Sequence, residues 1–110
     1  MRKIAEPALA ELGAGRAARI GRVVAFKGFG GRRADEAVLV APQRTVSGTL
    51  LGGAADDQIR AGAPESLLVE VSLGDSEAVA AGLACGGLAT VLASDVGAVP
   101  VEAWRALLAG

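Results

Sequence analysis

The sequence predicts an α+β domain built on a mixed, mostly antiparallel sheet of about five strands with covering helices. Three observations favour this class: five short apolar or alternating runs, two runs separated by a short turn, and helical spacing of apolar residues at both ends of the chain. Hairpin-linked strands mixed with helices favour an α+β sheet over a doubly wound one. At 110 residues, the chain is expected to form a single domain, residues 1–110.

The first element is expected to be a short helix. Its apolar residues fall on one face at helical spacing: Ile4, Ala8, Leu9 and Leu12. Pro7 is expected to lie near the first turn, because proline lacks the N–H that a helix interior needs. Gly13 and Gly15 are expected to end the helix.

A strand and a hairpin are expected next. Alternation over residues 19–26 predicts a strand with three apolar residues on one face: Ile20, Val24 and Phe26. Val23 and Ala25 are expected on the other face. Residues 37–41 and 45–50 read as two further strands, and the turn at residues 42–44 makes them a hairpin.

The rest of the chain is expected to alternate helices and strands. In order, these are a helix, a strand, a helix and a strand: residues 54–61, 67–73, 77–81 and 88–93. Asp56 and Asp57 suit the first turn of their helix, and Asp75 or Ser76 can cap the next one. A connector over residues 94–98 leads to a final helix with Pro100 in its first turn and a stripe of apolar residues: Val101, Trp104, Leu107 and Leu108.

Composition excludes several classes of function. The net charge is −1 and the aromatic residues are two Phe and one Trp, which weakens a nucleic-acid reading. Without histidine, a Ser-His-Asp triad is impossible, and we expect no enzyme activity from the chain alone. Charges interrupt every apolar run, so no membrane span is expected. With one cysteine and no signal peptide in view, a reducing, cytoplasmic location is expected.

Two glycine-rich turns at strand ends are the best candidates for a functional site. The first, residues 82–87, holds the one cysteine as Cys85-Gly86-Gly87, and the second, residues 48–53, ends in Gly52-Gly53. Glycine lets backbone N–H groups approach a ligand closely, and such groups at a helix start favour phosphate. Equally, Cys85 can be a small residue packed in a turn, and Gly52-Gly53 can be the junction between a strand and a helix.

A third loop, residues 27–33, places two arginines beside three glycines. Arg32 and Arg33 can be solvated surface charges, or they can bind a phosphate group in bidentate fashion. A cation of this kind would also be needed to activate Cys85, because the helix expected before it presents its negative end.

These three segments resemble the N-terminal domain of the XdhC/CoxI family, whose members mature molybdenum hydroxylases. Residues 82–87, Gly-Leu-Ala-Cys-Gly-Gly, match the family's Gly-x-x-Cys-Gly-Gly. Residues 46–53 stand where the family has Gly-Thr-Val-Gly-Gly-Gly-Cys, and residues 27–33 where it has Gly-Ser-Ser-Pro-Arg. The resemblance runs from about Val23 to Gly53 and from Val69 to Leu92, so it covers most of the chain between the terminal helices.

The resemblance implies an accessory protein that supports binding, sulfuration or insertion of the molybdenum cofactor (molybdopterin). The hydroxylase would be of the xanthine dehydrogenase or carbon monoxide dehydrogenase type. It implies that Cys85 contacts the metal or its terminal sulfur. It also implies a cofactor site formed by four glycines and two arginines: Gly86, Gly87, Gly52, Gly53, Arg32 and Arg33. In this site the amides of Gly86 and Gly87 would surround the pterin, and Arg32 and Arg33 would bind the phosphate. The expected partners are the hydroxylase apoenzyme, a cysteine desulfurase and a second copy of the chain.

The chain also departs from the family pattern. Ala54 stands where the family has a second cysteine, and Phe29-Gly30-Gly31 replaces the hydroxyls of Ser-Ser-Pro. These departures keep an alternative open: a degenerate interaction or scaffold module that binds partner proteins and no cofactor.

Overall fold

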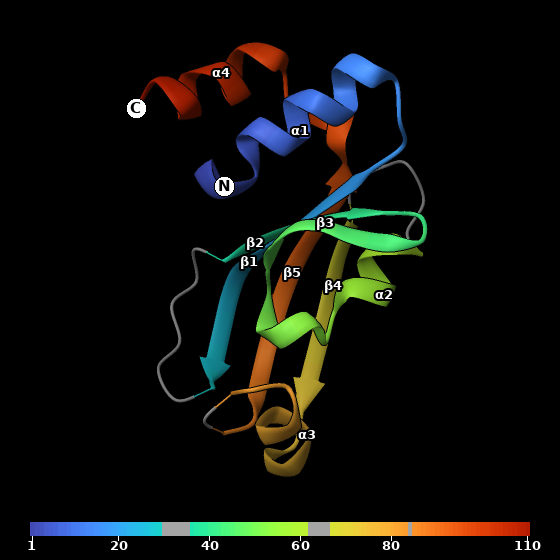
Figure 1. The fold of residues 1–110 in the computed structure, drawn as a ribbon. Coiled ribbons are helices and arrows are strands. Elements are labelled where there is room, and N and C mark those ends of the chain that lie inside the picture. Colours follow the sequence, from blue (N-terminus) through green and yellow to red (C-terminus); the bar gives the residue numbers. More distant parts are fainter. Residues whose placement is uncertain (30–35, 62–66, 84) are drawn as a thin grey trace.

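A computed structural model describes residues 1–29, 36–61, 67–83 and 85–110 of the chain (Figure 1). Its helices are α1 (Arg2–Ala14), α2 (Asp56–Arg60), α3 (Asp75–Ala80) and α4 (Val101–Ala109). Its strands are β1 (Arg19–Gly28), β2 (Ala37–Ala41), β3 (Arg44–Thr49), β4 (Leu67–Leu73) and β5 (Gly87–Asp95). Short turns of 3-10 type cover Leu51–Gly53 and Val96–Ala98. The predicted α+β class is confirmed.

The five strands form one antiparallel sheet in the order β3-β2-β1-β5-β4. β1 lies between β2 and β5, with Ile20 opposite Leu39 on one side and Ser94 on the other. The predicted hairpin is β2–β3, and β4 pairs with β5 along its whole length. The two outer strands are therefore β3 and β4. Figure 1 shows α1 and α4 together at one end of the sheet and α3 at the opposite end.

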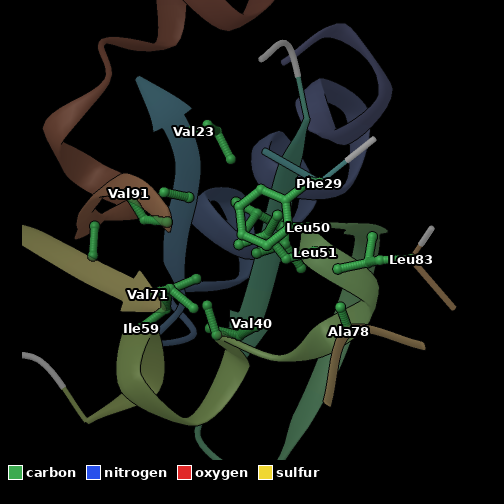
Figure 2. Packing of buried hydrophobic residues seen from close by; sticks show 14 residues of the cluster. Val23, Phe29, Val40, Leu50, Leu51, Ile59, Val71, Ala78, Leu83 and Val91 are labelled. Atoms are coloured by element: carbon green, nitrogen blue, oxygen red, sulfur yellow. The ribbon is translucent and has the colours of Figure 1, made fainter. Parts of the chain in front are cut away.

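The larger hydrophobic cluster covers one face of the sheet, under α2 and the turn Leu51–Gly53 (Figure 2). Strand residues of this face alternate with residues of the other face, as the pleat requires. α2 is fixed to the sheet in two ways. Ile59 packs against Gly21 of β1, and the guanidinium of Arg19 donates a hydrogen bond of 2.7 Å to the Ile59 carbonyl oxygen.

The second cluster lies on the opposite face, between the sheet and the pair α1 and α4. It joins the apolar faces of these helices to β1 and β2 through Ile4, Ala5, Ala8, Ile20, Leu39 and Trp104. Trp104 and Ile4 are fully buried. The predicted apolar face of α1 is thus confirmed. That of α4 is confirmed for Trp104 and Leu107, whereas Val101 lies outside the cluster and Leu108 is 39 % exposed. α1 covers β2 and β3, and the parts of β1, β5 and β4 nearer α3 have no helix on this face.

A β-bulge in β1 changes which residues share a face of this strand, so the prediction for its faces needs correction. The register with β5 shifts between Val23 and Ala25, so Val24 is an extra residue without a partner. After the bulge, Phe26 packs on the same cluster as Val23, and Val24 is left 42 % exposed. The prediction that Phe26 shares a face with Ile20 was therefore wrong, and so was the prediction that Ala25 shares a face with Val23.

Three predicted helix boundaries also need correction. Helix α1 begins at Arg2 and ends at Gly15, so Pro7 lies in its interior and Gly13 does not end it. Helix α3 begins two residues early, with Gly74 as its N-cap in place of Asp75 or Ser76. The Glu77 carboxylate accepts a 2.9 Å hydrogen bond from the Gly74 N–H, which fixes that start.

Two other boundaries shift. The 94–98 connector is shorter than expected, because β5 continues to Asp95, whose carboxylate accepts a hydrogen bond from the Gly97 N–H. Helix α2 is confined to Asp56–Arg60, with both predicted aspartates in its first turn. Among the described residues, no helix is long and apolar enough to cross a membrane.

Candidate functional site

The three glycine-containing segments meet at the end of the sheet where α3 lies. Gly28 at the end of β1 pairs with Gly87 at the start of β5, and the Phe29 N–H donates a 3.0 Å hydrogen bond to the Gly86 carbonyl oxygen. On the same side, Gly52 lies against the Ala81 carbonyl group at the end of α3. Segments more than 20 residues apart in the sequence therefore form one structural unit at this end of the sheet, and Figure 2 shows Phe29, Leu51 and Leu83 of these segments in one cluster.

Most glycines of this unit are needed because backbone lies directly against them. A Cβ on Gly28 would lie 2.7 Å from the Gly86 carbonyl oxygen, and one on Gly87 would lie 2.9 Å from the Phe29 nitrogen. A Cβ on Gly86 would lie 2.8 Å from the Gly74 carbonyl carbon. The space left by these missing side chains is filled by the chain itself. Their absence thus has a structural cause, and a binding role for Gly86 and Gly87 stays a prediction.

Asp75 holds the backbone beside Cys85. Its Oδ1 accepts a 2.8 Å hydrogen bond from the Gly86 N–H. Leu83, buried among the larger cluster, donates from its N–H to the Ala78 carbonyl oxygen at 2.8 Å. Cys85 lies between these two anchored residues and is half-buried. Its segment is therefore fixed on both sides while the thiol keeps access to solvent.

The turn after β3 adopts left-handed backbone angles at three consecutive residues. The φ angles are 50° at Leu51, 64° at Gly52 and 88° at Gly53. The Leu51 N–H donates to the Glu36 carboxylate at 3.2 Å, and the Gly53 N–H donates to the Leu50 carbonyl oxygen at 2.9 Å. Two of the amides that could have faced a phosphate group are thus already bonded within the chain.

Phe29 and Leu51 are the two non-glycine residues with positive φ in the described part of the chain. This conformation is unfavourable for side chains with a Cβ, and such residues concentrate at functional sites. Both side chains are 2 % exposed and belong to the same apolar cluster, so burial offsets the strain. No signal in the sequence singled out either residue for this conformation.

The acidic residues of this region serve the backbone. Asp56 accepts a hydrogen bond from the Thr45 hydroxyl at 2.5 Å and occupies the first turn of α2. Asp75 and Glu36 each accept a backbone amide, as described above. Within the described ranges, no group of three or more Cys, Asp or Glu side chains could hold a metal ion. Cys85, the predicted metal ligand, is therefore not part of such a group among the described residues.

Arg32 and Arg33, the predicted phosphate ligands, lie outside the described residues. A cluster of described charged residues lies elsewhere, at the end of the sheet near the start of β1. There the Glu11 carboxylate, which is 4 % exposed, accepts a 2.7 Å hydrogen bond from Arg16 and lies 3.9 Å from Arg44. The hydrogen bond from Arg16 lowers the pKa of Glu11 below its ordinary value, and this cluster joins α1 to the β2–β3 hairpin.

Close to this cluster, the surface has a pocket of about 290 Å³. It is lined by Ala18, Arg19, Val40, Pro42, Arg60 and Asp95. It lies at the opposite end of the sheet from Cys85, because Arg19 and Asp95 pair at the end of the strands remote from Gly28 and Gly87.

Comparison with known proteins adds no relative. No family model matches the chain, no curated protein matches it, and no solved structure matches its fold.

Proposed function

We propose that the chain is an accessory protein for the molybdenum cofactor, supporting its binding, sulfuration or insertion into a molybdenum hydroxylase of the xanthine dehydrogenase or carbon monoxide dehydrogenase type. One observation carries the proposal. The described parts of the three segments that resemble the XdhC/CoxI family lie at one end of the sheet, where Gly28 and Phe29 contact Gly86 and Gly87, next in sequence to the half-buried Cys85.

The residues present fit such a cofactor in their donor chemistry. Thiolate is a soft ligand of the kind that binds soft metal centres and sulfur, and Cys85 is the one thiol of the chain. Gly53 lies beside open space, because a Cβ there would approach just one atom, the Asp56 carboxylate oxygen at 3.9 Å. We assign Cys85 to the metal or its terminal sulfur, Gly53 to the pterin, and Arg32 and Arg33 to the phosphate. When bound, the cofactor supplies the redox-active metal, and the chain holds it.

The proposed partners follow from this role. A carrier of this kind must meet the hydroxylase apoenzyme, which receives the cofactor, and a cysteine desulfurase, which supplies sulfur. Both meetings need a reduced thiol, and a cytoplasmic location provides it.

The test is to express the chain in a host that makes molybdopterin and to purify it without oxidation. Bound molybdenum is measured per chain by mass spectrometry, and pterin by fluorescence after oxidation. We expect both in the wild type, and a loss of at least about tenfold in metal for Cys85→Ala, a soft-ligand deletion. Ser76→Ala, an exposed position on α3, is the control. Equal metal in Cys85→Ala and the wild type would remove the proposed role of the thiol.

A second candidate is an interaction module that keeps the fold and binds no cofactor. It is favoured by the amides of Gly86 and Gly53, which are bonded to Asp75 and Leu50 and so are not free for a pterin. Purified wild-type chain that carries neither molybdenum nor pterin, yet captures a hydroxylase subunit, would select this candidate.

A further inference from the structure

Half of one sheet face carries apolar side chains that none of the described helices covers. We call it the open face: the side of β1, β5 and β4 that continues from α1 and α4 toward α3. It comprises Arg22, Ala25 and Lys27 of β1, Leu88, Thr90 and Leu92 of β5, and Leu68, Glu70 and Ser72 of β4. Leu68 is 65 % exposed and Leu88 is 43 % exposed. Three of the five large apolar residues that are exposed in the described chain lie on or beside this face, if Val24 at the bulge is included.

The strand register arranges the open face in three levels across the sheet. At the first level, Arg22 lies beside Leu92 and Leu92 beside Leu68. The second level is Ala25, Thr90 and Glu70, and the third is Lys27, Leu88 and Ser72. Basic residues therefore lie on β1 at the first and third levels, and an acidic residue lies on β4 at the level between them. Within the described residues, no ion pair involves Arg22, Lys27 or Glu70.

A hollow of about 700 Å³ borders the open face at its first level. It is formed between the terminal helices and β1 and is lined mainly by apolar side chains: Met1, Arg2, Arg22, Val99, Ala103, Ala106 and Leu107. Arg22 belongs to both the hollow and the open face, so the two are continuous.

We propose that the open face binds a second copy of the chain around a two-fold axis that runs along β5, midway between the two sheets. A rotation about such an axis exchanges the β1 side of the open face with its β4 side, because these strands flank β5. It leaves each residue at its own level along the strands. β5 of one copy then faces β5 of its partner, and β4 of each copy lies over β1 of the other. Sheets that pack face to face lie about 10 Å apart, within reach of long side chains from both sides.

The charges of the open face are complementary under this operation. Glu70 of one copy comes to the level between Arg22 and Lys27 of the other, one level (about 7 Å) from each. The contact occurs twice, because a two-fold interface repeats every pair. The leucines of β5, Leu88 and Leu92, meet their own equivalents and bury the exposed apolar surface.

The shape is complementary as well. Leu68 of one copy lies above Arg22 of the other, at the mouth of the hollow between α1 and α4, which accepts an apolar side chain. Among the described elements, α1 covers the β2–β3 side of this face, and the helices reach β1 near its start, at Ile20 and Arg22. The rest of the open face is left for the partner's strands. The helices then lie beside the free edge of the partner's β4. An uncovered edge strand with the sequence Leu-Leu-Val-Glu-Val-Ser-Leu is an aggregation hazard, and this arrangement protects it.

This dimer does not depend on the proposed function, because none of its contacts uses Cys85 or a residue assigned to the cofactor. Lys27 is the one contact residue that belongs to a segment of the candidate site. Since the axis runs along the strands, both Cys85 residues would lie at the same end of the dimer.

The test uses sedimentation equilibrium of the full chain over a wide concentration range, with two charge variants. We expect a dimer for the wild type. Glu70→Arg, and separately Arg22→Glu combined with Lys27→Glu, should each weaken dimerisation at least about tenfold, because like charges then face each other. Mixing the two variants should restore a dimer to wild-type affinity, since a heterodimer has both contacts with opposite charges. The rescue excludes misfolding as the cause of dissociation.

A matched pair of apolar variants tests the hollow. Leu68→Lys should dissociate the dimer, whereas Val79→Lys, at a position 62 % exposed on α3, should not. A wild-type chain that stays monomeric at every concentration overturns the proposal. A dimer that survives both charge variants also overturns it, and it would indicate pairing through another surface such as the β4 edge.

Discussion

Replacing Gly52 with alanine should destabilise the fold far more than the same change at Gly53. The two neighbours share a left-handed backbone, with φ angles of 64° and 88°. They differ in what surrounds them. A Cβ on Gly52 would lie on the Ala81 carbonyl oxygen and 2.9 Å from its carbon, whereas one on Gly53 would lie 3.9 Å from the Asp56 carboxylate oxygen. The pair therefore separates the cost of the backbone angle from the cost of the contact.

The expected free energies follow from these two terms. A left-handed residue with a Cβ costs about 1–2 kcal/mol, and both variants carry this cost. Overpacking against rigid backbone adds about 1–3 kcal/mol at Gly52 alone. We therefore expect a loss of about 2–5 kcal/mol for Gly52→Ala and about 1–2 kcal/mol for Gly53→Ala. Small domains have about 5–15 kcal/mol in total, so Gly53→Ala should stay folded and Gly52→Ala should be marginal.

The assay is urea unfolding followed by the fluorescence of Trp104, the single tryptophan, which is fully buried. The free energy of unfolding is extrapolated to water for each variant. Equal losses at the two positions would refute the reasoning, since they would mean that the contact between Gly52 and Ala81 contributes nothing. A folded Gly53→Ala variant then serves as the clean test of cofactor binding at this turn.

Three further changes test other parts of the structure. The hydrogen bond from Arg16 holds the pKa of Glu11 below its ordinary value of 4.5, so its stabilisation is complete above that value and is lost as the pH falls through the lower, folded-state pKa. Glu11→Gln should therefore lower the free energy of unfolding at about pH 6 and approach the wild type in acid; a difference independent of pH would contradict this. Trp104→Ala should cost about 3–5 kcal/mol, but Trp104→Phe far less, because the indole N–H has no hydrogen-bond partner among the described residues; thermal unfolding followed by circular dichroism compares the two. Asp75→Ala frees the amide that follows Cys85 and should raise the rate of Cys85 alkylation several-fold in a mass-spectrometric time course, with an unchanged rate as the contrary result.

Local patterns predicted the elements that depend on local physics. The strand Leu67–Leu73 was predicted to the residue, because its apolar and polar side chains alternate and Gly74 follows. The terminal helices were predicted from apolar spacing, and their packing on one sheet face gives that spacing its cause.

The errors fall where distant contacts decide. At Val23, Val24 and Ala25 three apolar residues stand in a row, so no change of pattern could reveal the bulge between them. Asp75 was a reasonable cap for α3, but its carboxylate is engaged by the Gly86 amide, eleven residues away in the sequence. Gly74 starts the helix instead. The convergence of the three glycine segments likewise depends on strand order, which the pattern of single elements does not contain.

The structure divides the resemblance to the XdhC/CoxI family into two kinds of residue. Gly28, Gly52, Gly86 and Gly87 are each required by a backbone segment that lies against them, so any protein with this fold would need them whatever it binds. Cys85 is different: it is half-exposed, and its thiol is free. The glycines therefore have a structural explanation in this chain, and the proposed function depends on the cysteine. For this reason Cys85→Ala with metal analysis tests the function more directly than any change at a glycine.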